Sequence, residues 1–320
     1  MKVGFIGAGK VGFSLGKFFA ENSGAAQAAG QSAQAAGQSA QGTGQSAQAA
    51  GRNSDNEIQV TGYYSRHAES AREAAEFTNS KCYEDVELLV EESDAIFLTV
   101  PDGAIKSTYD RIKVFDISNK QICHCSGALS SAEVFDDVRE RGACGYSIHP
   151  LFPVSDKLNS YQEMPDAFFC LEGEGDGIRF WESYIKTHCR GSKLIDGKSK
   201  VKYHAACAIA SNLYCALMQE SLELLGQCGF DREEALAALS ALIESNMKHI
   251  LEDGPVEALT GPVERGDAGT VEKHIKCLER ETDRELYLAA SRKLTEVARA
   301  KNPDRDYSGL DRVLDAEDAE

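Results

Sequence analysis

The sequence contains no apolar run of the roughly 18 residues that a membrane-spanning helix needs. It begins directly with a predicted strand instead of a basic segment, an apolar stretch and a cleavage site, so no secretory leader is expected. Its ten cysteines form no CxxC pair and no regular spacing, which predicts reduced core thiols. These absences favour a soluble protein of the cytoplasm.

Positive charge is scarce as well. The chain has 34 lysines and arginines against 51 aspartates and glutamates, a formal net charge of -17. An acidic surface argues against binding to the phosphate backbone of nucleic acids. We therefore expect a small-molecule substrate, and neither a nucleic acid nor a membrane as a partner. The 320 residues suffice for two domains.

A glycine motif stands near the start of the chain, between an apolar run and a helical pattern. Glycine permits the tight turn and the close approach of the backbone to a pyrophosphate, and the helix N-terminus offers N–H groups to the anion. The spacing therefore predicts a dinucleotide-binding loop. Its expected contacts are Gly7, Ala8, Gly9, Lys10, Val11 and Gly12.

The end of the second predicted strand indicates which dinucleotide binds. The segment "EIQVTGYYSRH" reaches Ser65 and Arg66, where an NAD enzyme usually has an acidic residue for the ribose 2′-hydroxyl. A hydroxyl and a guanidinium suit a 2′-phosphate, so NADP is the expected cofactor. The alternative for Arg66 is an ordinary solvated cation.

A repetitive segment separates the first helical pattern from this strand. The unit "GQSAQ" occurs three times within residues 23–56. The period of seven is that of a coiled coil, but alanine is the only apolar residue of the unit. Such a segment cannot bury enough surface to offset its ordering entropy, so we expect a disordered surface insertion.

Three further predicted strands end in small or polar residues, at Val100-Pro101, at Ser126-Gly127 and at His149. Ligands of an open parallel sheet lie beyond the carboxyl ends of its strands, so these positions should face nicotinamide and substrate. A structural role for His149 is about as plausible as a functional one, and for His124 the structural role is favoured. Adjacent strand residues point to opposite faces, so His124 and its neighbouring cysteines predict no metal site.

From Ser199 onward the pattern is helical. The expected fold class is therefore α/β, a Rossmann-type mostly parallel sheet followed by an all-helical C-terminal domain. We place the NADP-binding domain at 1–198, the helical substrate or dimerisation domain at 199–310 and an acidic tail at 311–320. A predicted helix over 203–229 has apolar residues on more than one face, which favours a homodimer. The alternative is a central helix covered by its own domain.

The segment "YHAACAIASN" within that helix combines polar and very small residues. Seven residues make nearly two turns, so His204 and Ser211 should share a face, flanked by Asn212. Histidine can donate a proton near neutral pH, and an amide or hydroxyl can orient a carbonyl. The alternative is that His204 is a satisfied core histidine. Close helix packing would explain the alanines equally well.

Several motifs together resemble a family of oxidoreductases that joins a Rossmann-like NADP-binding domain to a helical domain of unassigned function, DUF2520. They are "GFIGAGKVG", "TVPDGAI", "HCSGALS", "SIHPLFPVSD", "YHAACAIASN" and "LTGPVERGDAGTVEKHI". The resemblance covers nearly the whole chain apart from the repeats and the tail. The layout is more distantly similar to pyrroline-5-carboxylate reductase, to 6-phosphogluconate-dehydrogenase-like enzymes and to deazaflavin-dependent NADP oxidoreductases. Some members of the nearer family are thought to reduce ketopantoate.

The sequence departs from one relative at a catalytic position. β-Hydroxyacid dehydrogenases carry a lysine four residues before an asparagine, whereas here Ala208 stands four before Asn212. Their mechanism cannot be transferred, and Lys202 is only a candidate substitute. The resemblance implies an NADPH-dependent reductase of a small 2-oxo acid, with ketopantoate as the leading candidate. An imine reductase of the pyrroline-5-carboxylate type and a non-catalytic NADP-binding regulator are the alternatives.

Overall fold

The computed structural model describes residues 1–23 and 57–316. The predicted insertion at 23–56 therefore lies outside the described residues, apart from Ser23. The chain divides into two compact units, residues 1–210 and 211–320, whereas the sequence placed the boundary at 198. Each unit is described by itself below.

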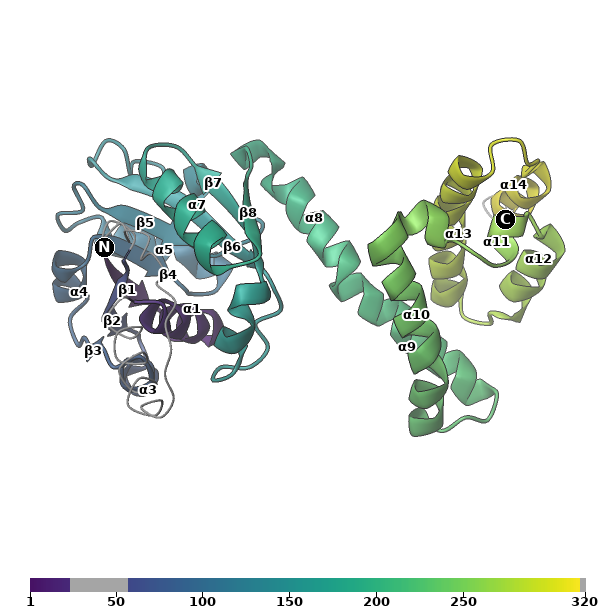
Figure 1. Ribbon diagram of the computed structural model, residues 1–320, viewed down its shortest axis with the longest axis horizontal. Coiled ribbons are helices and arrows are strands. Elements are labelled where there is room, and N and C mark those ends of the chain that lie inside the picture. Colours follow the sequence, from purple (N-terminus) through teal and green to yellow (C-terminus); the bar gives the residue numbers. More distant parts are fainter. Residues whose placement is uncertain (24–56, 317–320) are drawn as a thin grey trace, which may run out of the picture. The chain divides into compact units, whose positions relative to one another are not determined.

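The first unit is built on an eight-stranded sheet with the strand order β3-β2-β1-β4-β5-β6-β7-β8 (Figure 1). Its neighbouring strands are parallel except for β6 and β7, which run antiparallel. This sheet confirms the predicted Rossmann-type fold. The strands are β1 Lys2–Ile6, β2 Gln59–Tyr64, β3 Lys81–Cys82, β4 Ala95–Leu98, β5 Gln121–His124, β6 Cys144–Leu151, β7 Phe168–Gly173 and β8 Gly191–Leu194.

Helices cover both faces of this sheet, because successive side chains of a strand point to opposite faces. Phe5 and Phe97 pack in one core with the buried sides of α1, α3 and α7, whereas Ile6 packs in a second core with α4 and α5. The helices are α1 Lys10–Glu21, α3 Ala68–Thr78, α4 Val86–Glu92, α5 Asp102–Ile112, α6 Ser131–Val134, α7 Gly177–His188 and α8 Lys200–Ala210, with 3₁₀ turns at Ser160–Asp166 and Gly197–Ser199.

The helix after the glycine motif lies unusually close to the sheet. A Cβ atom at Gly16 would lie 1.7 Å from the Tyr63 hydroxyl oxygen, so a side chain there is excluded. The same hydroxyl donates to the carbonyl of Gly12 at 3.2 Å. Glycines one turn apart thus seat α1 against β2, which fixes the helix N-terminus at the sheet edge.

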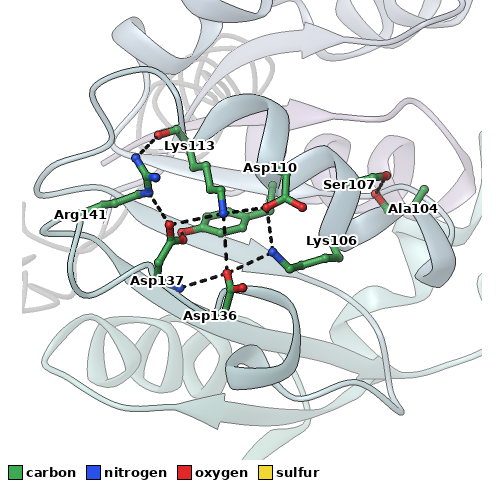
Figure 2. A network of polar contacts seen from close by, with 9 residues as sticks. Ala104, Lys106, Ser107, Asp110, Lys113, Asp136, Asp137 and Arg141 are labelled. Atoms are coloured by element: carbon green, nitrogen blue, oxygen red, sulfur yellow. Dashed lines mark hydrogen bonds and ion pairs between the residues drawn. The ribbon is translucent and has the colours of Figure 1, made fainter.

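A charged network holds α5 against the segment that follows α6 (Figure 2). The Lys113 ammonium lies 2.8 Å from Asp110 and 3.3 Å from Asp137. Asp137 also accepts from Arg141 at 2.8 Å and from the Tyr109 hydroxyl at 2.7 Å. Exposed ion pairs contribute little individually, but these share partners around the buried Tyr109 ring. The network therefore anchors the helix whose first residue, Asp102, reaches the candidate site.

The second unit is helical, as predicted. It has a small core made of Val263, Val271, Ile275, Leu288, Ala298, Tyr307, Leu310 and Leu314. Leu314 is buried in the last helix, so the acidic tail begins later than the predicted residue 311. The helices are α9 Asn212–Gln227, α10 Arg232–Ala258, α11 Pro262–Arg265, α12 Ala268–Cys277, α13 Glu281–Lys301 and α14 Ser308–Asp315.

The single helix predicted over 203–229 is two helices in the structure. α8 ends at Ala210 and α9 begins at Asn212, with Ser211 between them at φ -120° and ψ -70°. Serine and asparagine are weak helix formers because their side chains compete for backbone hydrogen bonds. None of the helices in the two described ranges has the length and apolarity needed to cross a membrane.

Candidate functional site

A cavity of about 390 Å³ lies at the carboxyl ends of β2, β1 and β4. We call it the arginine pocket. Seven of the predicted cofactor residues line it, namely Gly7, Ala8, Gly9, Ser65, Arg66, Val100 and Pro101. The remaining lining residues are Ile6, Tyr64, His67, Ser70, Thr99, Thr108 and Arg111. The sheet edge thus gathers residues that are about 100 positions apart in the sequence.

The glycine loop fits the phosphates of a dinucleotide. Gly7 has φ 109°, and a Cβ there would lie 2.5 Å from the Thr99 carbonyl oxygen, so this position requires glycine. A Cβ on Gly9 would meet no atom within 4 Å, which leaves open space above its backbone. Gly9 is also the N-cap of α1 and offers no side-chain cap to the first N–H groups of that helix. These donors suit an anion.

The charges around the arginine pocket are opposite to the net charge of the chain. Arg66 and Arg111 both line it, and its lining residues include no carboxylate. The Arg111 guanidinium donates to the Tyr64 hydroxyl at 3.4 Å, which places it next to the end of β2. A basic lining of this kind suits a ribose 2′-phosphate.

A second group of residues lies farther along the same edge, at the carboxyl ends of β5 and β6. The loop after β5 is joined to α5 because the Ser126 hydroxyl donates to Asp102 at 2.7 Å. The same oxygen accepts from the N–H groups of Ala128 and Leu129, at 3.2 Å and 3.1 Å. Asp102 directly follows Pro101, so this contact links the loop after β5 to the arginine pocket.

Two imidazoles meet at the backbone of Gly127. A Cβ added to Gly127 would lie 2.5 Å from Cδ2 of His204 and 2.9 Å from Nε2 of His149. The two rings have centroids 6.2 Å apart. His149 is half-buried and His204 is exposed on α8. Glycine is required here because any side chain would fill the space that the two rings face.

A buried lysine lies behind these rings. Lys200, the first residue of α8, is fully buried, and its ammonium donates to the Ser126 carbonyl at 2.8 Å and to the Ser147 hydroxyl at 2.6 Å. Burial lowers the pKa of Lys200, while the nearby Cys170 and Glu172 oppose that shift. The lysine connects the start of α8 to the ends of β5 and β6.

The group formed by Gly127, His149, Lys200, Tyr203 and His204 is called the histidine cluster below. His149 Nδ1 lies 2.7 Å from the Tyr203 hydroxyl. Burial first, and then Lys200 and His204, lower the pKa of His149 to about 4. Burial, followed by the Cys170 and Cys207 thiols, raises the pKa of Tyr203 far above its ordinary value. Both groups are therefore neutral near pH 7.

His124 lies outside this cluster, in the core. It is fully buried and its Nδ1 accepts from the Ser126 backbone N–H at 3.1 Å. Burial first, and Lys200 second, lower the pKa of His124 to about 3. This neutral imidazole shapes the loop after β5, in line with the structural role favoured for it. Among the described residues no group of three or more His, Cys, Asp or Glu is arranged to hold a metal.

The remaining predicted residues fall in three places. Lys10, Val11 and Gly12 form the first turn of α1. Lys202 has an exposed side chain on α8, whereas the buried lysine is Lys200. Ser211 and Asn212 belong to the second unit, so their proposed partnership with His204 stays a prediction.

Sequence reasoning missed Arg111, Lys200 and Tyr203. No local pattern distinguishes Lys200 from Lys198 and Lys202 in "GKSKVKYH". Its signal is tertiary, since its partners Ser126 and Ser147 belong to two different strands' ends. Arg111 likewise reaches the pocket from the last turn of α5, three turns from the motif that begins that helix.

The chain matches two family models. Residues 35–123 match the model described as "NADP oxidoreductase coenzyme F420-dependent", and residues 167–294 match the domain of unknown function DUF2520. The first match includes Ser65, Arg66, Val100 and Pro101, and the second includes Lys200, Tyr203 and His204. These matches confirm the predicted class, an NADP-dependent oxidoreductase with a DUF2520 domain.

Solved structures share this architecture. A protein from Thermotoga maritima is 25% identical, with a TM-score of 0.66, over 93% of this chain and 99% of that one. An imine reductase from Myxococcus stipitatus in complex with NADP+ is 14% identical, with a TM-score of 0.59, over 98% and 100%. A pyrroline-5-carboxylate reductase from Coxiella burnetii is 17% identical, with a TM-score of 0.52, over 93% and 97%. The search of curated proteins gives no match.

Proposed function

We propose that this chain, with its NADP oxidoreductase domain and its DUF2520 domain, is an NADPH-dependent reductase of a small 2-oxo acid. The observation that carries the proposal is the sequence of sites along one sheet edge. The arginine pocket lies at β2, β1 and β4, and the histidine cluster lies at β5 and β6. A dinucleotide with its 2′-phosphate at Arg66 would extend along this edge toward Gly127.

Bound NADPH would supply a hydride to the substrate carbonyl carbon. The residues of this chain would hold the cofactor and manage the proton. Arg66 and Arg111 would hold the 2′-phosphate, and the open backbone at Gly9 would admit the pyrophosphate. The exposed His204 would deliver a proton to the oxygen, because an imidazole can donate near neutral pH. His149 would polarise that oxygen by a hydrogen bond.

Ketopantoate is the leading substrate among the 2-oxo acids, as implied by the family resemblance. Reduction of a carbonyl needs both a hydride and a proton, and the two imidazoles facing Gly127 provide groups for the second part.

An imine reductase is the second candidate. The imine and pyrroline-5-carboxylate reductases with the same fold favour it, as does the low pKa of His149. A protonated imine is already activated, so a neutral imidazole that orients it would suffice. A regulator that binds NADP without turnover is the third candidate.

NADPH oxidation followed across a panel of 2-oxo acids, ketopantoate included, and cyclic imines tests these candidates. We expect turnover with a 2-oxo acid that depends on His204. Turnover only with imines would replace the first candidate by the second. Tight NADPH binding without turnover on any panel member would favour the regulator.

We also infer that the chain forms a homodimer. α9 has no buried residue in the described structure, and it exposes Leu213 to 56% and Leu217 to 42%. α10 adds Leu242 and Leu251, which are 67% and 79% exposed. Apolar side chains gathered on neighbouring helices favour association, and a second copy of the same chain is the commonest partner.

Light scattering at micromolar concentration should show a dimer, and Leu217→Glu should shift it toward monomer. Leu88→Glu is the matched control, because Leu88 is 49% exposed on α4 of the first unit. A wild-type protein that is only monomeric would mean that the chain covers this face itself.

A further inference from the structure

The contact between His149 and Tyr203 has a consequence for the direction of a hydrogen bond, and the inference below rests on the proposed function. The Tyr203 hydroxyl lies 2.7 Å from Nδ1 of His149, and the two rings are nearly perpendicular, at 85°. A neutral imidazole carries one hydrogen, on Nδ1 or on Nε2. The partner of Nδ1 therefore decides what Nε2 can do.

The groups around His149 keep it neutral. Lys200, Tyr203 and His204 face it from α8, and Cys170 pairs with it across β7. The Lys200 ammonium opposes a second positive charge nearby, and burial opposes any charge on the ring. The same burial keeps the Tyr203 phenol protonated. The pair is thus a neutral phenol beside a neutral imidazole.

The phenol has two kinds of acceptor within reach. One is Nδ1 of His149, and the other is the sulfur of Cys170 or Cys207, both of which lie close to the hydroxyl. An unprotonated ring nitrogen is a good acceptor, whereas a thiol sulfur is a weak one. The phenol O–H is therefore expected to point to Nδ1, and the imidazole hydrogen then lies on Nε2.

Nε2 of His149 faces the backbone of Gly127, 2.9 Å from the position that a Cβ would occupy. We propose that Tyr203 is a positioning residue that holds His149 as the Nε2–H tautomer, so that this N–H is presented to the substrate's reacting oxygen or nitrogen beside Gly127. The glycine keeps this space free, and His204 lies on its other side. Tyr203 itself does not touch the substrate in this arrangement.

The tautomer can be measured without any substrate. In ¹⁵N spectra of the histidine-labelled full chain at pH 7, His149 should show an unprotonated Nδ1 and a protonated Nε2, assigned by loss of its signals in His149→Gln. Tyr203→Phe should shift this pattern toward the other tautomer or a mixture. Tyr161→Phe is the control, because Tyr161 lies in the same unit near the 3₁₀ turn at Ser160–Asp166. A protonated Nδ1 in the wild type, or an unchanged pattern in Tyr203→Phe, would overturn the proposal.

Kinetics separate this role from a structural one. Tyr203→Phe should lower kcat by about 10–100-fold with little change in KM, as expected for an orienting partner. The amide nitrogen of glutamine takes the place of Nε2 and has no tautomers, so in a His149→Gln background Tyr203→Phe should change kcat by less than about twofold. A full additional loss in that background would make Tyr203 a direct participant and refute the positioning role.

The spectra and the kinetics fail separately. The tautomer measurement stands even if no panel substrate is turned over, in which case the proposed reaction fails. Turnover with the wrong tautomer would leave the reaction and refute the role of Tyr203.

Discussion

The arginine pocket and the histidine cluster lie on one sheet edge but differ in burial. Arg66 and Arg111 in the pocket have exposed side chains, and neither depends on a buried partner for its charge. Lys200 in the cluster is fully buried, and the pKa values of Lys200, His149 and Tyr203 are all displaced by burial. Exposed charges suit recognition of a soluble anion, whereas displaced pKa values are common where chemistry occurs. Binding and catalysis should therefore be separable along this edge.

The sharpest test of this separation is His204→Gln. Because His204 is expected to transfer the proton, the substitution should lower turnover by about 10²–10⁴, while NADPH affinity stays near that of the wild type. Turnover on the identified substrate and cofactor titration measure the two parts. His188→Gln on α7 is the control. Unchanged turnover, or a variant that only unfolds, would return His204 to a structural role.

The burial on the cluster side also predicts a dependence of stability on pH. The pKa of His124 is about 3 in the folded state, below its ordinary value of 6.5, so the unfolded chain takes up the proton first as pH falls. The contribution of neutral His124 is complete above about pH 6.5 and is lost as pH falls toward 3. Between pH 7 and 4 the loss should be on the order of 3 kcal/mol.

Urea unfolding at a series of pH values, with His124→Asn as the comparison, measures this contribution. Asparagine can keep an acceptor near the position of Nδ1 but does not titrate in this range. The variant should lose less stability than the wild type on acidification. Parallel curves for the two proteins would show that His124 is protonated equally in both states.

On the pocket side, Arg66→Asp should discriminate between cofactors. NADPH binding should weaken by about 1–3 kcal/mol more than NADH binding, because a charge-assisted contact to the 2′-phosphate is lost. The turnover number at saturating cofactor should change little, which is the opposite of the result expected for His204. Arg72→Asp makes the same charge change on α3 outside the pocket lining. Equal losses for NADPH and NADH would refute the assignment.

The smallest effect is expected from the repetitive segment. Its composition cannot offset the entropy of ordering, so replacing Gly24–Gly51 by a short Gly/Ser linker should leave both halves of the comparison intact. Thermal unfolding and NADPH titration should match the wild type. A cooperative loss of folding would show that the repeats pack against the protein.

The sequence predicted the strand, turn and helix at the N-terminus because the glycine requirement is local. Gly7 needs a positive φ and Gly12 close packing, and both needs leave a readable spacing. Ser65 and Arg66 were also predictable, since they follow the end of a strand with a regular apolar pattern. The break at Ser211 was not predicted, because the apolar pattern continues through it and only weak local propensities oppose the helix.

By itself the sequence determined the fold class, the cofactor loop and the histidines worth testing, because each depends on neighbours within one or two elements. Only the tertiary structure decided which lysine is buried and how His149 is oriented. Lys200 meets Ser126 and Ser147, and His149 meets Tyr203, at separations of 53 to 74 residues. Such contacts are set by the order of β5, β6 and α8 in space, and strand order leaves no spacing in the sequence from which it could be read.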